Sequence, residues 1–391
     1  MDPRILKALE RMNYEELTPI QEKTFLPILD SRDLLATAET GSGKTSACGI
    51  PLVQLIDPSQ KIIQALVVVP TRELALQYVE EIDRIAHFVD VIPFAVYGGF
   101  PMDVQKAKLQ AGVHILVATP GRLIDLIYNG HISLSGVRTM ILDEADEMLK
   151  LGFLEDINLI FSFLIHEHQT LLFSATMPLE VKKLTQSYLK DPVTIELNLE
   201  QRAPQSLEHH FKYIGHSDRL QALLDYMQTE SISQAIVFCN TRSKSERLYN
   251  KLKGHVKSVE IIHGGLEQSK RTSIIRRFKS HRIDIMIATD LAGRGLDFMK
   301  VSHVIIFDFP QTTDIYTHRT GRAGRMGRLG TAVTFVSDRE LRDLKRLLEV
   351  NRIVPVWLGE KPELTQTRGG THQRGSRPRS RGRRPPSRRS G

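Results

Sequence analysis

Cysteine is scarce in this chain, and long apolar stretches are missing from it. The 391 residues contain only Cys48 and Cys239. Two cysteines are too few for a disulfide framework and have no metal-site spacing, so both are predicted to be core thiols. No stretch approaches the roughly 18 apolar residues that a membrane span needs. The opening segment MDPRILKALERMNYEEL carries acids and has no apolar core, which is not typical of a secretory signal. We therefore expect a soluble protein in a reducing compartment, which is the cytoplasm, or the nucleus if the source is eukaryotic.

Acidic residues are absent from the end of the chain. From Arg368 onward the sequence holds nine arginines and no Asp or Glu. Without these arginines, 44 basic residues face 45 acidic ones, so the net charge of +8 comes from the tail. Such a composition cannot bury apolar surface, which predicts that residues 359–391 are a disordered basic tail. A block of positive charge is typical of a segment that binds RNA or DNA. The alternatives are a solubility tail and a nuclear address.

Short apolar runs rich in β-branched residues recur through the rest of the chain and alternate with helical patterns. Continuous runs of this kind predict buried parallel strands and an open α/β sheet. The alternation is interrupted at 198–210, a polar stretch that contains a proline. We therefore predict two domains, at 1–200 and 207–358, joined by a linker at 201–206. The runs are ALVVVP (65–70), VHILVATP (113–120), TMILDEAD (139–146), TLLFSAT (170–176), AIVFCN (235–240), SVEII (258–262), IDIMIATD (283–290), HVIIFD (303–308) and TAVTFVS (331–337).

The two halves also look like an internal duplication. VVVPTREL in the first half is similar to VFCNTRSK in the second, and ILVATPGR is similar to IMIATDLAGR. The spacing agrees, because Thr71 and Thr119 are 48 residues apart, as are Thr241 and Thr289. We expect two similar sheets that present Thr and Arg at the carboxyl ends of strands, where open α/β sheets bind ligands.

A phosphate-binding loop is indicated by ATAETGSGKT at 36–45. The N–H groups of a Gly-rich turn that opens a helix cradle phosphates, a Lys reaches the β- and γ-phosphates, and a Thr hydroxyl binds Mg²⁺. Lys44 and Thr45 supply these two side chains, and Ala38 stands where the general pattern has Gly. An ordinary Gly/Ser turn would not explain the Lys-Thr pair.

Two carboxylates follow a predicted strand further along the chain. Asp143 and Glu144 come directly after the apolar run TMIL, so they stand at a strand end. An acid there can hold Mg²⁺, and its neighbour can orient or deprotonate the attacking water. Taken alone, a cluster of acids favoured by a helix dipole explains them equally well. The phosphate loop earlier in the chain favours the catalytic interpretation.

With these motifs in place, the sequence resembles the DEAD-box RNA helicases, whose name spells residues 143 to 146. The resemblance covers roughly residues 5 to 355, and Asn13 stands where the family usually has Gly. It implies two tandem RecA-like domains with doubly wound parallel sheets, and an ATP-dependent RNA helicase that uses Mg²⁺. The motifs occur in the family's order: TPIQ (18–21), AETGSGKT (38–45), PTREL (70–74), GG (98–99), TPGR (119–122), DEAD, SAT (174–176), HGGLEQSKR (263–271), ATDLAGRGLD (288–297) and HRTGRAGR (318–325).

The resemblance implies roles for the residues of the ATP site. Gln21 should read the adenine edge, and Tyr14 should stack on its face. Lys44 should bind phosphates, and Glu144 should position the water. Thr45 and Asp143 should hold Mg²⁺. The other residues expected to bind nucleotide are Ala38, Glu39, Thr40, Gly41, Ser42, Gly43 and Asp297.

A second arginine-rich stretch, HRTGRAGRMGR at 318–328, is separated from the tail by ordinary folded-domain sequence, so it is a built site. An arginine supplied from outside the phosphate loop increases the rate of phosphoryl transfer by about 10³–10⁵-fold. By the resemblance, Arg322 and Arg325 fill this role, and Arg328 has none. The residues expected to couple the ATP pocket to the RNA side are Asp146, Ser174, Thr176 and His318.

The same resemblance implies an RNA groove across both domains. Backbone amides, hydroxyls and arginines should contact phosphates and sugars, which fixes position without reading sequence, and the 2′-OH distinguishes RNA from DNA. A helix cap is the alternative for any single Thr or Arg. The residues are Thr71, Arg72, Gly99, Thr119, Pro120, Gly121, Arg122, Asn240, Arg242, Gly264 and Thr289.

These expectations describe an ATP-gated clamp. ATP and RNA together close the domains and bend one strand, so a short duplex comes apart locally, while the tail tethers RNA. We expect single-stranded RNA and short duplexes as partners, ribosomal or other ribonucleoprotein particles among the substrates, no membrane contact, and a monomer. The main alternative is an RNA-binding or annealing chaperone with weak ATPase. A DNA helicase and a protein-remodelling ATPase are the others.

Overall fold

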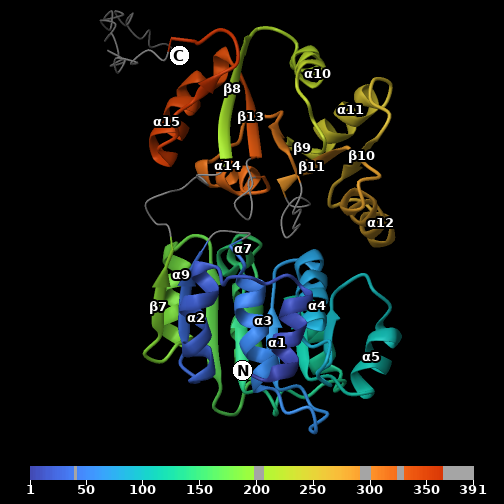
Figure 1. Ribbon diagram of the computed structural model, residues 1–391, viewed down its shortest axis with the longest axis vertical. Helices are drawn as coiled ribbons and strands as arrows, with labels where there is room; N and C mark the ends of the chain where they lie inside the picture. The colour runs from blue at the N-terminus through green and yellow to red at the C-terminus, as the bar shows by residue number, and fades with distance from the viewer. Residues whose placement is uncertain (39–41, 198–206, 291–300, 324–329, 364–391) are drawn as a thin grey trace, which may run out of the picture.

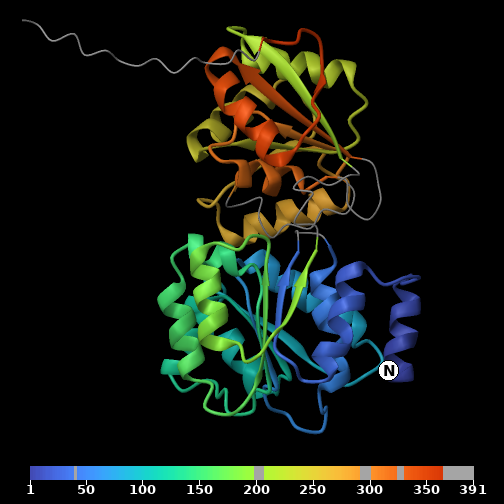
Figure 2. The same ribbon diagram turned by 90° about the vertical axis from the view of Figure 1, so that its left-hand side faces the viewer.

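The computed structural model describes residues 1–38, 42–197, 207–290, 301–323 and 330–363. These residues form two α/β domains stacked one above the other, each built on a seven-stranded parallel sheet (Figures 1 and 2). The predicted fold class is thereby confirmed. The parts of the prediction that lie outside the described residues are the linker 201–206, the tail from 364 onward, Glu39, Thr40, Gly41, Asp297, Arg325 and Arg328.

The first sheet has the strand order β3-β4-β2-β5-β6-β1-β7, and its pairs are parallel. Its strands are β1 (Leu34–Thr37), β2 (Ala65–Val68), β3 (Pro93–Val96), β4 (Ile115–Ala118), β5 (Thr139–Leu142), β6 (Gln169–Ser174) and β7 (Val193–Glu196). The helices around it are α1 (Pro3–Arg11), α2 (Pro19–Leu29), α3 (Lys44–Leu55), α4 (Arg72–Ile85), α5 (Met102–Gln110), α6 (Pro120–Tyr128), α7 (Ala145–Lys150), α8 (Leu154–Ser162) and α9 (Leu179–Tyr188).

Helices cover both faces of this sheet, which is why its central strands are apolar without alternation. Ala65 and Val67 of β2 point into a core shared with α1, α2, α3 and α4. Their neighbours Leu66 and Val68 point into a second core shared with α6, α8 and α9. The sheet is therefore doubly wound, and its strand ends are left for polar residues.

The second sheet has the order β10-β11-β9-β12-β13-β8-β14, again with parallel pairs. Its strands are β8 (Leu207–Gly215), β9 (Ala235–Cys239), β10 (Val259–Ile262), β11 (Ile285–Thr289), β12 (His303–Ile306), β13 (Gly330–Ser337) and β14 (Val356–Trp357). Its helices are α10 (Arg219–Thr229), α11 (Arg242–Leu252), α12 (Gln268–Lys279), α14 (Thr313–Thr320), the short 3₁₀ helix η1 (Asp338–Glu340) and α15 (Leu341–Asn351).

The expected duplication is confirmed strand by strand. Replacing each strand of the first sheet by the strand seven places later in the chain reproduces the order of the second sheet. The register agrees as well, because Ala65 lies beside Ile115 in one sheet and Ala235 lies beside Ile285 in the other. Equivalent residues of the two domains can therefore be compared directly.

Both cysteines are buried and free of disulfides, as the sequence predicted. Cys48 lies on α3 and Cys239 ends β9. Among the described residues, no helix combines the length and apolar character needed to cross a membrane.

Candidate nucleotide and RNA site

The phosphate loop joins β1 to α3. Gly43, the N-cap of α3, has φ +94°, a left-handed conformation that glycine adopts without strain. In the described part of the chain no side chain caps this helix end, so its N–H groups and positive dipole are available to a phosphate. Lys44 is buried, donates from Nζ to the Ala38 carbonyl at 2.9 Å, and lies 4.0 Å from Asp143 Oδ1. The lysine therefore lies between the loop and the first DEAD carboxylate. Thr45, half-buried, is the next residue of α3.

Gln21 is held beside the loop by its own helix start. Its Oε1 accepts from the N–H of Thr18, the N-cap of α2, at 2.9 Å. Its Nε2 donates to the Gly43 carbonyl at 3.4 Å. A Cβ on Gly43 would meet that nitrogen at 2.8 Å and displace the Gln21 amide, while the positive φ is what favours glycine here. The structure thus places Gln21 against the phosphate loop, and its contact with adenine stays a prediction.

Tyr14 is half-buried beside α3. Its hydroxyl contacts Ser46 and donates to Glu81 Oε1 at 3.0 Å. Burial and the charge of Glu81 raise the pKa of Tyr14 to about 12, so the hydroxyl keeps its proton. The preceding residue, Asn13, has φ +57°, which explains why glycine is usual there and why asparagine is tolerated. Stacking of this ring on adenine stays a prediction.

Asp143 and Glu144, the first two carboxylates of the DEAD motif, lie buried at the end of β5. Tyr78 donates to Asp143 Oδ2 at 2.6 Å, and the N–H of Glu144 donates to Asp143 Oδ1 at 2.8 Å. Glu144 has φ +54°, a strained conformation for a residue with a side chain, of the kind that clusters at functional sites. Burial and the charge of Asp143 raise the pKa of Glu144 to about 7, while Lys44 and Arg322 oppose the shift. A carboxylate with a pKa near neutrality can accept a proton from water.

Asp146 connects this pocket to the SAT segment. Thr176 donates to Asp146 Oδ2 at 2.7 Å, and Ser174 donates to the Thr176 carbonyl at 2.7 Å. Burial alone would raise the pKa of Asp146, but the hydrogen bond from Thr176 and the charges of Lys150 and His318 lower it. His318 belongs to the other domain, so its charge acts on the group formed by Asp146, Ser174 and Thr176 from across the domain boundary.

The predicted catalytic arginine Arg322 follows α14 and is 1% exposed. It belongs to the second domain, yet its charge acts on Glu144 of the first. The guanidinium donates from Nε to the His318 carbonyl at 3.2 Å, which ties it to the coupling residue. Arg322 and Glu144, the predicted catalytic groups of the two domains, therefore lie close enough for their charges to interact.

α4 and α12, which belong to different domains, touch near the predicted groove. Arg72 Nη1 donates to Gln268 Oε1 at 2.9 Å, and Arg271 Nη2 lies 2.8 Å from Glu73 Oε1. No role was predicted from the sequence for Glu73, Gln268 or Arg271. All three residues lie inside the motifs PTREL and HGGLEQSKR, which could have suggested a role for them. A contact such as that between Gln268 and Glu73, 195 residues apart, leaves no local pattern in the sequence.

The predicted RNA residues of the first domain line its strand ends. The hydroxyl of Thr71 caps α4 and accepts a backbone N–H at 3.2 Å, so the helix-cap alternative holds for it. Gly99 has φ +79°, and a Cβ there would come within 2.7 Å of Arg72 Nη1. Arg122 donates to the Phe100 carbonyl at 3.0 Å and so holds the Gly-Gly loop. The others begin α6: Thr119 as N-cap, then Pro120 and exposed Gly121.

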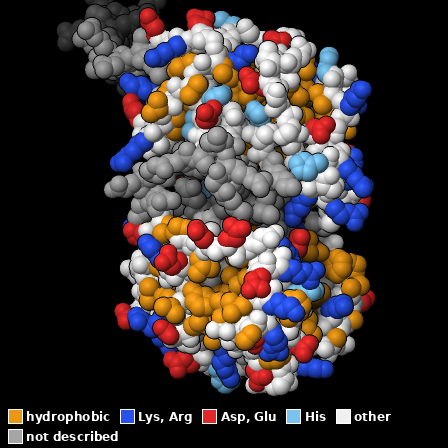
Figure 3. All heavy atoms as spheres, viewed as in Figure 1, with side chains coloured by type: hydrophobic (Ala, Val, Ile, Leu, Met, Phe, Trp, Pro, Cys, Tyr) orange, Lys and Arg blue, Asp and Glu red, His pale blue; other side chains and the backbone are white. Residues whose placement is uncertain are grey.

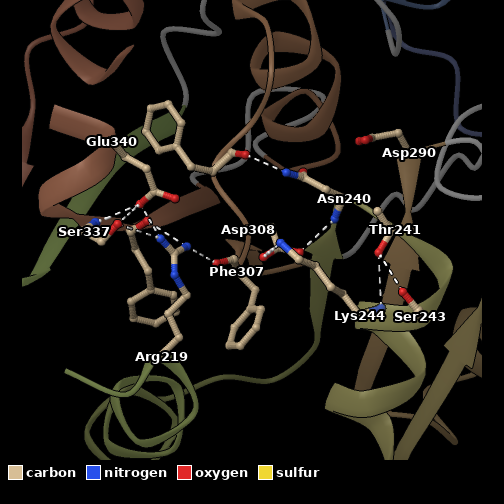
Figure 4. A network of polar contacts seen from close by, with 12 residues as sticks. Arg219, Asn240, Thr241, Ser243, Lys244, Asp290, Phe307, Asp308, Ser337 and Glu340 are labelled. Carbon is tan, nitrogen blue, oxygen red and sulfur yellow. Dashed lines mark hydrogen bonds and ion pairs between the residues drawn. The ribbon is translucent and has the colours of Figure 1, made fainter. Parts of the chain in front are cut away.

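The predicted RNA residues of the second domain are more strongly engaged with their own domain. Asn240 Oδ1 accepts from Arg319 Nη2 at 2.6 Å, and its Nδ2 donates to the Phe309 carbonyl at 2.9 Å. Figure 4 shows Asn240 among this polar network. Both groups of the Asn240 side-chain amide, and its backbone N–H, therefore have partners within the domain. Arg242 pairs with Glu246 at 2.9 Å, Gly264 follows β10, and Thr289 ends β11. Contact of these residues with RNA stays a prediction.

Comparison with known proteins decides the family. Residues 18–184 match the model of the DEAD/DEAH box helicase domain, and residues 216–327 match that of the helicase conserved C-terminal domain. The chain belongs to the DEAD-box helicases. It is 40% identical over 370 residues to the DEAD-box ATP-dependent RNA helicase CshA of Geobacillus kaustophilus, covering 93% of this chain and 79% of that one. It is also 40% identical to the Bacillus subtilis protein of that name, over 81% of this chain and 64% of the other. The expected ATP-dependent RNA helicase is thereby confirmed, and the chaperone alternative is not favoured.

Solved structures of DEAD-box proteins show the same two-domain fold. Saccharomyces cerevisiae Dbp5 bound to RNA and ADP-BeF3 superposes with a TM-score of 0.82 at 26% identity, over 92% of this chain and 94% of that one. The helicase Mss116 bound to single-stranded RNA and UDP-BeF superposes with a TM-score of 0.81 at 30% identity, over 93% of this chain and 79% of that one. A DEAD box protein from Methanococcus jannaschii is 34% identical, but its TM-score is only 0.55, over 92% of this chain and 97% of that one. The arrangement of the two domains here is thus closer to that of the two RNA-bound relatives.

Proposed function

We propose that this enzyme is an ATP-gated clamp that closes its two domains on one RNA strand and separates short duplexes locally. The observation that carries the proposal is the position of Arg322, which is buried and acts on Glu144 across the domain boundary. Neither domain alone holds both groups. Closure therefore completes the catalytic site, and opening takes it apart.

The residues around the phosphate loop support ATP hydrolysis with Mg²⁺. The described residues contain no cluster of three or more side chains able to hold a metal by themselves. That fits Mg²⁺, which proteins bind through one or two oxygens together with substrate phosphates. Thr45 and Asp143 would supply those oxygens, and the bound ion would neutralise phosphate charge. Lys44 binds the phosphates, and Glu144 orients the attacking water. Arg322 stabilises the charge that develops on the transferred phosphoryl group.

The RNA side supports a substrate recognised by its backbone. The candidate groove presents hydroxyls, glycines and arginines, which position phosphates without reading bases. We propose that single strands, short duplexes and ribonucleoprotein particles, including ribosomal ones, are substrates of a monomeric cytoplasmic enzyme. The link from Asp146 to Thr176 and His318 would pass the closed state of the ATP pocket to this groove.

Steady-state ATP hydrolysis, with and without single-stranded RNA, tests the proposal. RNA should stimulate turnover strongly, and Glu144→Gln should lower the stimulated kcat by about 10²–10⁴-fold, the usual contribution of a general base. The matched control is Glu155→Gln, the same change at an exposed position of α8, which should behave as wild type. Turnover that ignores RNA, or that survives in Glu144→Gln, would contradict the clamp.

A further inference from the structure

The positive charge of the second domain is concentrated in one segment. Residues 242–282 hold 12 Lys and Arg against 3 Asp and Glu. They span α11, β10 and α12, and α12 alone has five basic residues and no acid. Figure 3 shows Lys and Arg side chains gathered on the right of the upper domain, where Figure 1 places α11 and α12. The proposed catalytic residues lie outside this segment.

A hollow of about 470 Å³ lies at the end of α12 and is lined by three arginines and two serines. Residues three and four apart share one face of a helix, which places the lining residues of α12 together. Among the described residues no acid lines the hollow. A guanidinium group can donate two parallel hydrogen bonds to the oxygens of one phosphate, and serine hydroxyls can donate to phosphate oxygens as well. The lining residues are Ser273, Arg276, Arg277, Ser280 and Arg282.

The charge of this hollow is incompletely balanced. Arg277 Nη1 lies 2.7 Å from Glu260 Oε1. Arg276 and Arg282 are exposed, and no acid of the described chain pairs with either. Like charges held together repel one another, and a bound polyanion relieves that repulsion.

The hollow lies on the same helix, α12, as Gln268, which contacts a predicted groove residue. α12 begins at Gln268, which receives the hydrogen bond from Arg72 across the domain boundary. Arg276 lies eight residues further along the helix, about 12 Å at 1.5 Å per residue. An RNA strand that leaves the groove toward the second domain therefore reaches the arginines within a few nucleotides.

We propose that Arg276 and Arg282, together with Arg277 and the two serines, bind phosphates of RNA that extends beyond the groove. The proposal rests on RNA being the ligand of the groove, and it adds a second contact on a separate surface. It makes affinity depend on RNA length, because only a strand that overhangs the groove reaches the hollow.

The test compares two RNAs and two double variants of the full chain. One RNA is the shortest single strand that the wild type binds measurably, and the other is about ten nucleotides longer, or about 34 Å when stacked. Arg276→Gln/Arg282→Gln should weaken binding of the longer RNA about 5- to 20-fold and leave the shorter one unchanged. The salt slope for the longer RNA should fall by about 1.4, as expected for two lost phosphate contacts on a single strand. The matched control is Arg342→Gln/Arg346→Gln, which removes the same charge from exposed positions of α15 and should change neither RNA.

Other outcomes overturn the proposal. If the variant lost affinity equally for both RNAs, the cause would be a change in the groove or in folding. If the control variant lost as much affinity for the longer RNA, the cause would be the overall charge of the domain. Inorganic phosphate that binds the wild type but not the variant, with no dependence on RNA length, would make the hollow a site for free anions. ATPase stimulation by the shorter RNA is measured on the same samples. Its absence in the wild type would sink the proposed function, while the length dependence of binding is judged separately.

Discussion

The two domains share one strand order and one register but carry opposite charge. Residues 1–200 hold 17 Lys and Arg against 27 Asp and Glu, a net charge of −10. Residues 201–358 hold 26 against 16, a net charge of +10. The near-neutral net charge outside the tail is therefore the sum of two oppositely charged domains, which attract each other. The positive charge of the second domain also attracts a polyanion such as RNA.

The domains also differ at the place where the first one holds its phosphate loop. β8 takes the place of β1 in the sheet, and α10 follows it as α3 follows β1. Arg219 begins α10 as Lys44 begins α3, but its guanidinium donates to the Phe307 carbonyl and pairs with Glu340 (Figure 4). The N-cap of α10 is Asp218, whose own carboxylate accepts a helix N–H. The second domain thus fills with its own side chains the position that the first leaves to a nucleotide.

This difference shows how one architecture becomes a catalyst or a partner of a catalyst. Polar groups without internal partners at the carboxyl end of a strand can bind a ligand. Where side chains of the same domain form hydrogen bonds with those groups, they stabilise the fold instead.

The largest expected contrast is between Arg322 and Arg219, which both belong to the second domain. Arg322→Ala should lower the RNA-stimulated kcat by about 10³-fold or more, because it removes charge stabilisation from the transferred phosphoryl group. Arg219→Ala should leave kcat within a few-fold and lower the free energy of unfolding by about 1–3 kcal/mol, because it breaks buried hydrogen bonds. ATPase assays and thermal unfolding of both variants check this. A loss of kcat in Arg219→Ala without loss of stability would break the comparison.

A smaller contrast is expected between two ion pairs across the domain boundary. Arg271 and Glu73 are 2.8 Å apart and nearly buried, with 11% and 5% side-chain exposure. Lys279 and Glu80 are 3.5 Å apart and open to solvent. Arg271→Gln should weaken the closed state by about 3 kcal/mol because it removes the charged partner of a buried carboxylate, whereas Lys279→Gln should cost less than about 1 kcal/mol. Energy transfer between dyes on the two domains, titrated with RNA and a non-hydrolysable ATP analogue, measures closure. Equal effects would mean that overall charge rather than the buried pair holds the domains together.

The smallest contrast concerns two equivalent acids. Leu142 pairs with Val68 and Ile306 with Phe238, so the second residue after each strand is Glu144 in one domain and Asp308 in the other. Asp308 accepts from the Asn240 N–H at 3.0 Å and from Lys244 Nζ at 2.9 Å.

Folding raises the pKa of Glu144 from 4.5 to about 7, so the folded state binds its proton more tightly than the unfolded state. The free energy of unfolding therefore falls as the pH rises from about 4.5 to about 7. Without nucleotide, Glu144→Gln should be more stable than wild type at pH 8 by about 1–3 kcal/mol, and the gain should shrink toward pH 5. Asp308→Asn should be destabilised by about 1–2 kcal/mol. Thermal unfolding across this pH range checks both predictions. If Glu144→Gln were less stable than wild type at pH 8, the buried charge of Glu144 would not be destabilising and the prediction would be wrong.

Local patterns were enough to predict nine of the 14 strands in the described residues, the phosphate loop and the duplication, whereas β1, β3, β7, β8 and β14 were not among the predicted runs. Buried parallel strands require continuous apolar runs, and a phosphate loop requires Gly, Lys and Thr at close spacing, so both leave signals within a few residues. The contact of Glu73 with Arg271 leaves no such signal, because its partners come from different domains. The engagement of the Asn240 amide could not be predicted either, because it depends on Arg319, 79 residues away.

The sequence by itself determined that the chain has two α/β halves, that one carries a nucleotide loop, and that the other carries the arginines. Short-range periodicity and spacing encode these features. Only the tertiary structure decided which of the two equivalent strand edges stays open. Lys44 and Arg219 are both basic residues at the start of a helix, but Glu340, 121 residues away, reaches only Arg219. Folding places Asp143 4.0 Å from Lys44, within the candidate nucleotide site itself, but places Glu340 directly on Arg219, and no pattern around either residue records this difference.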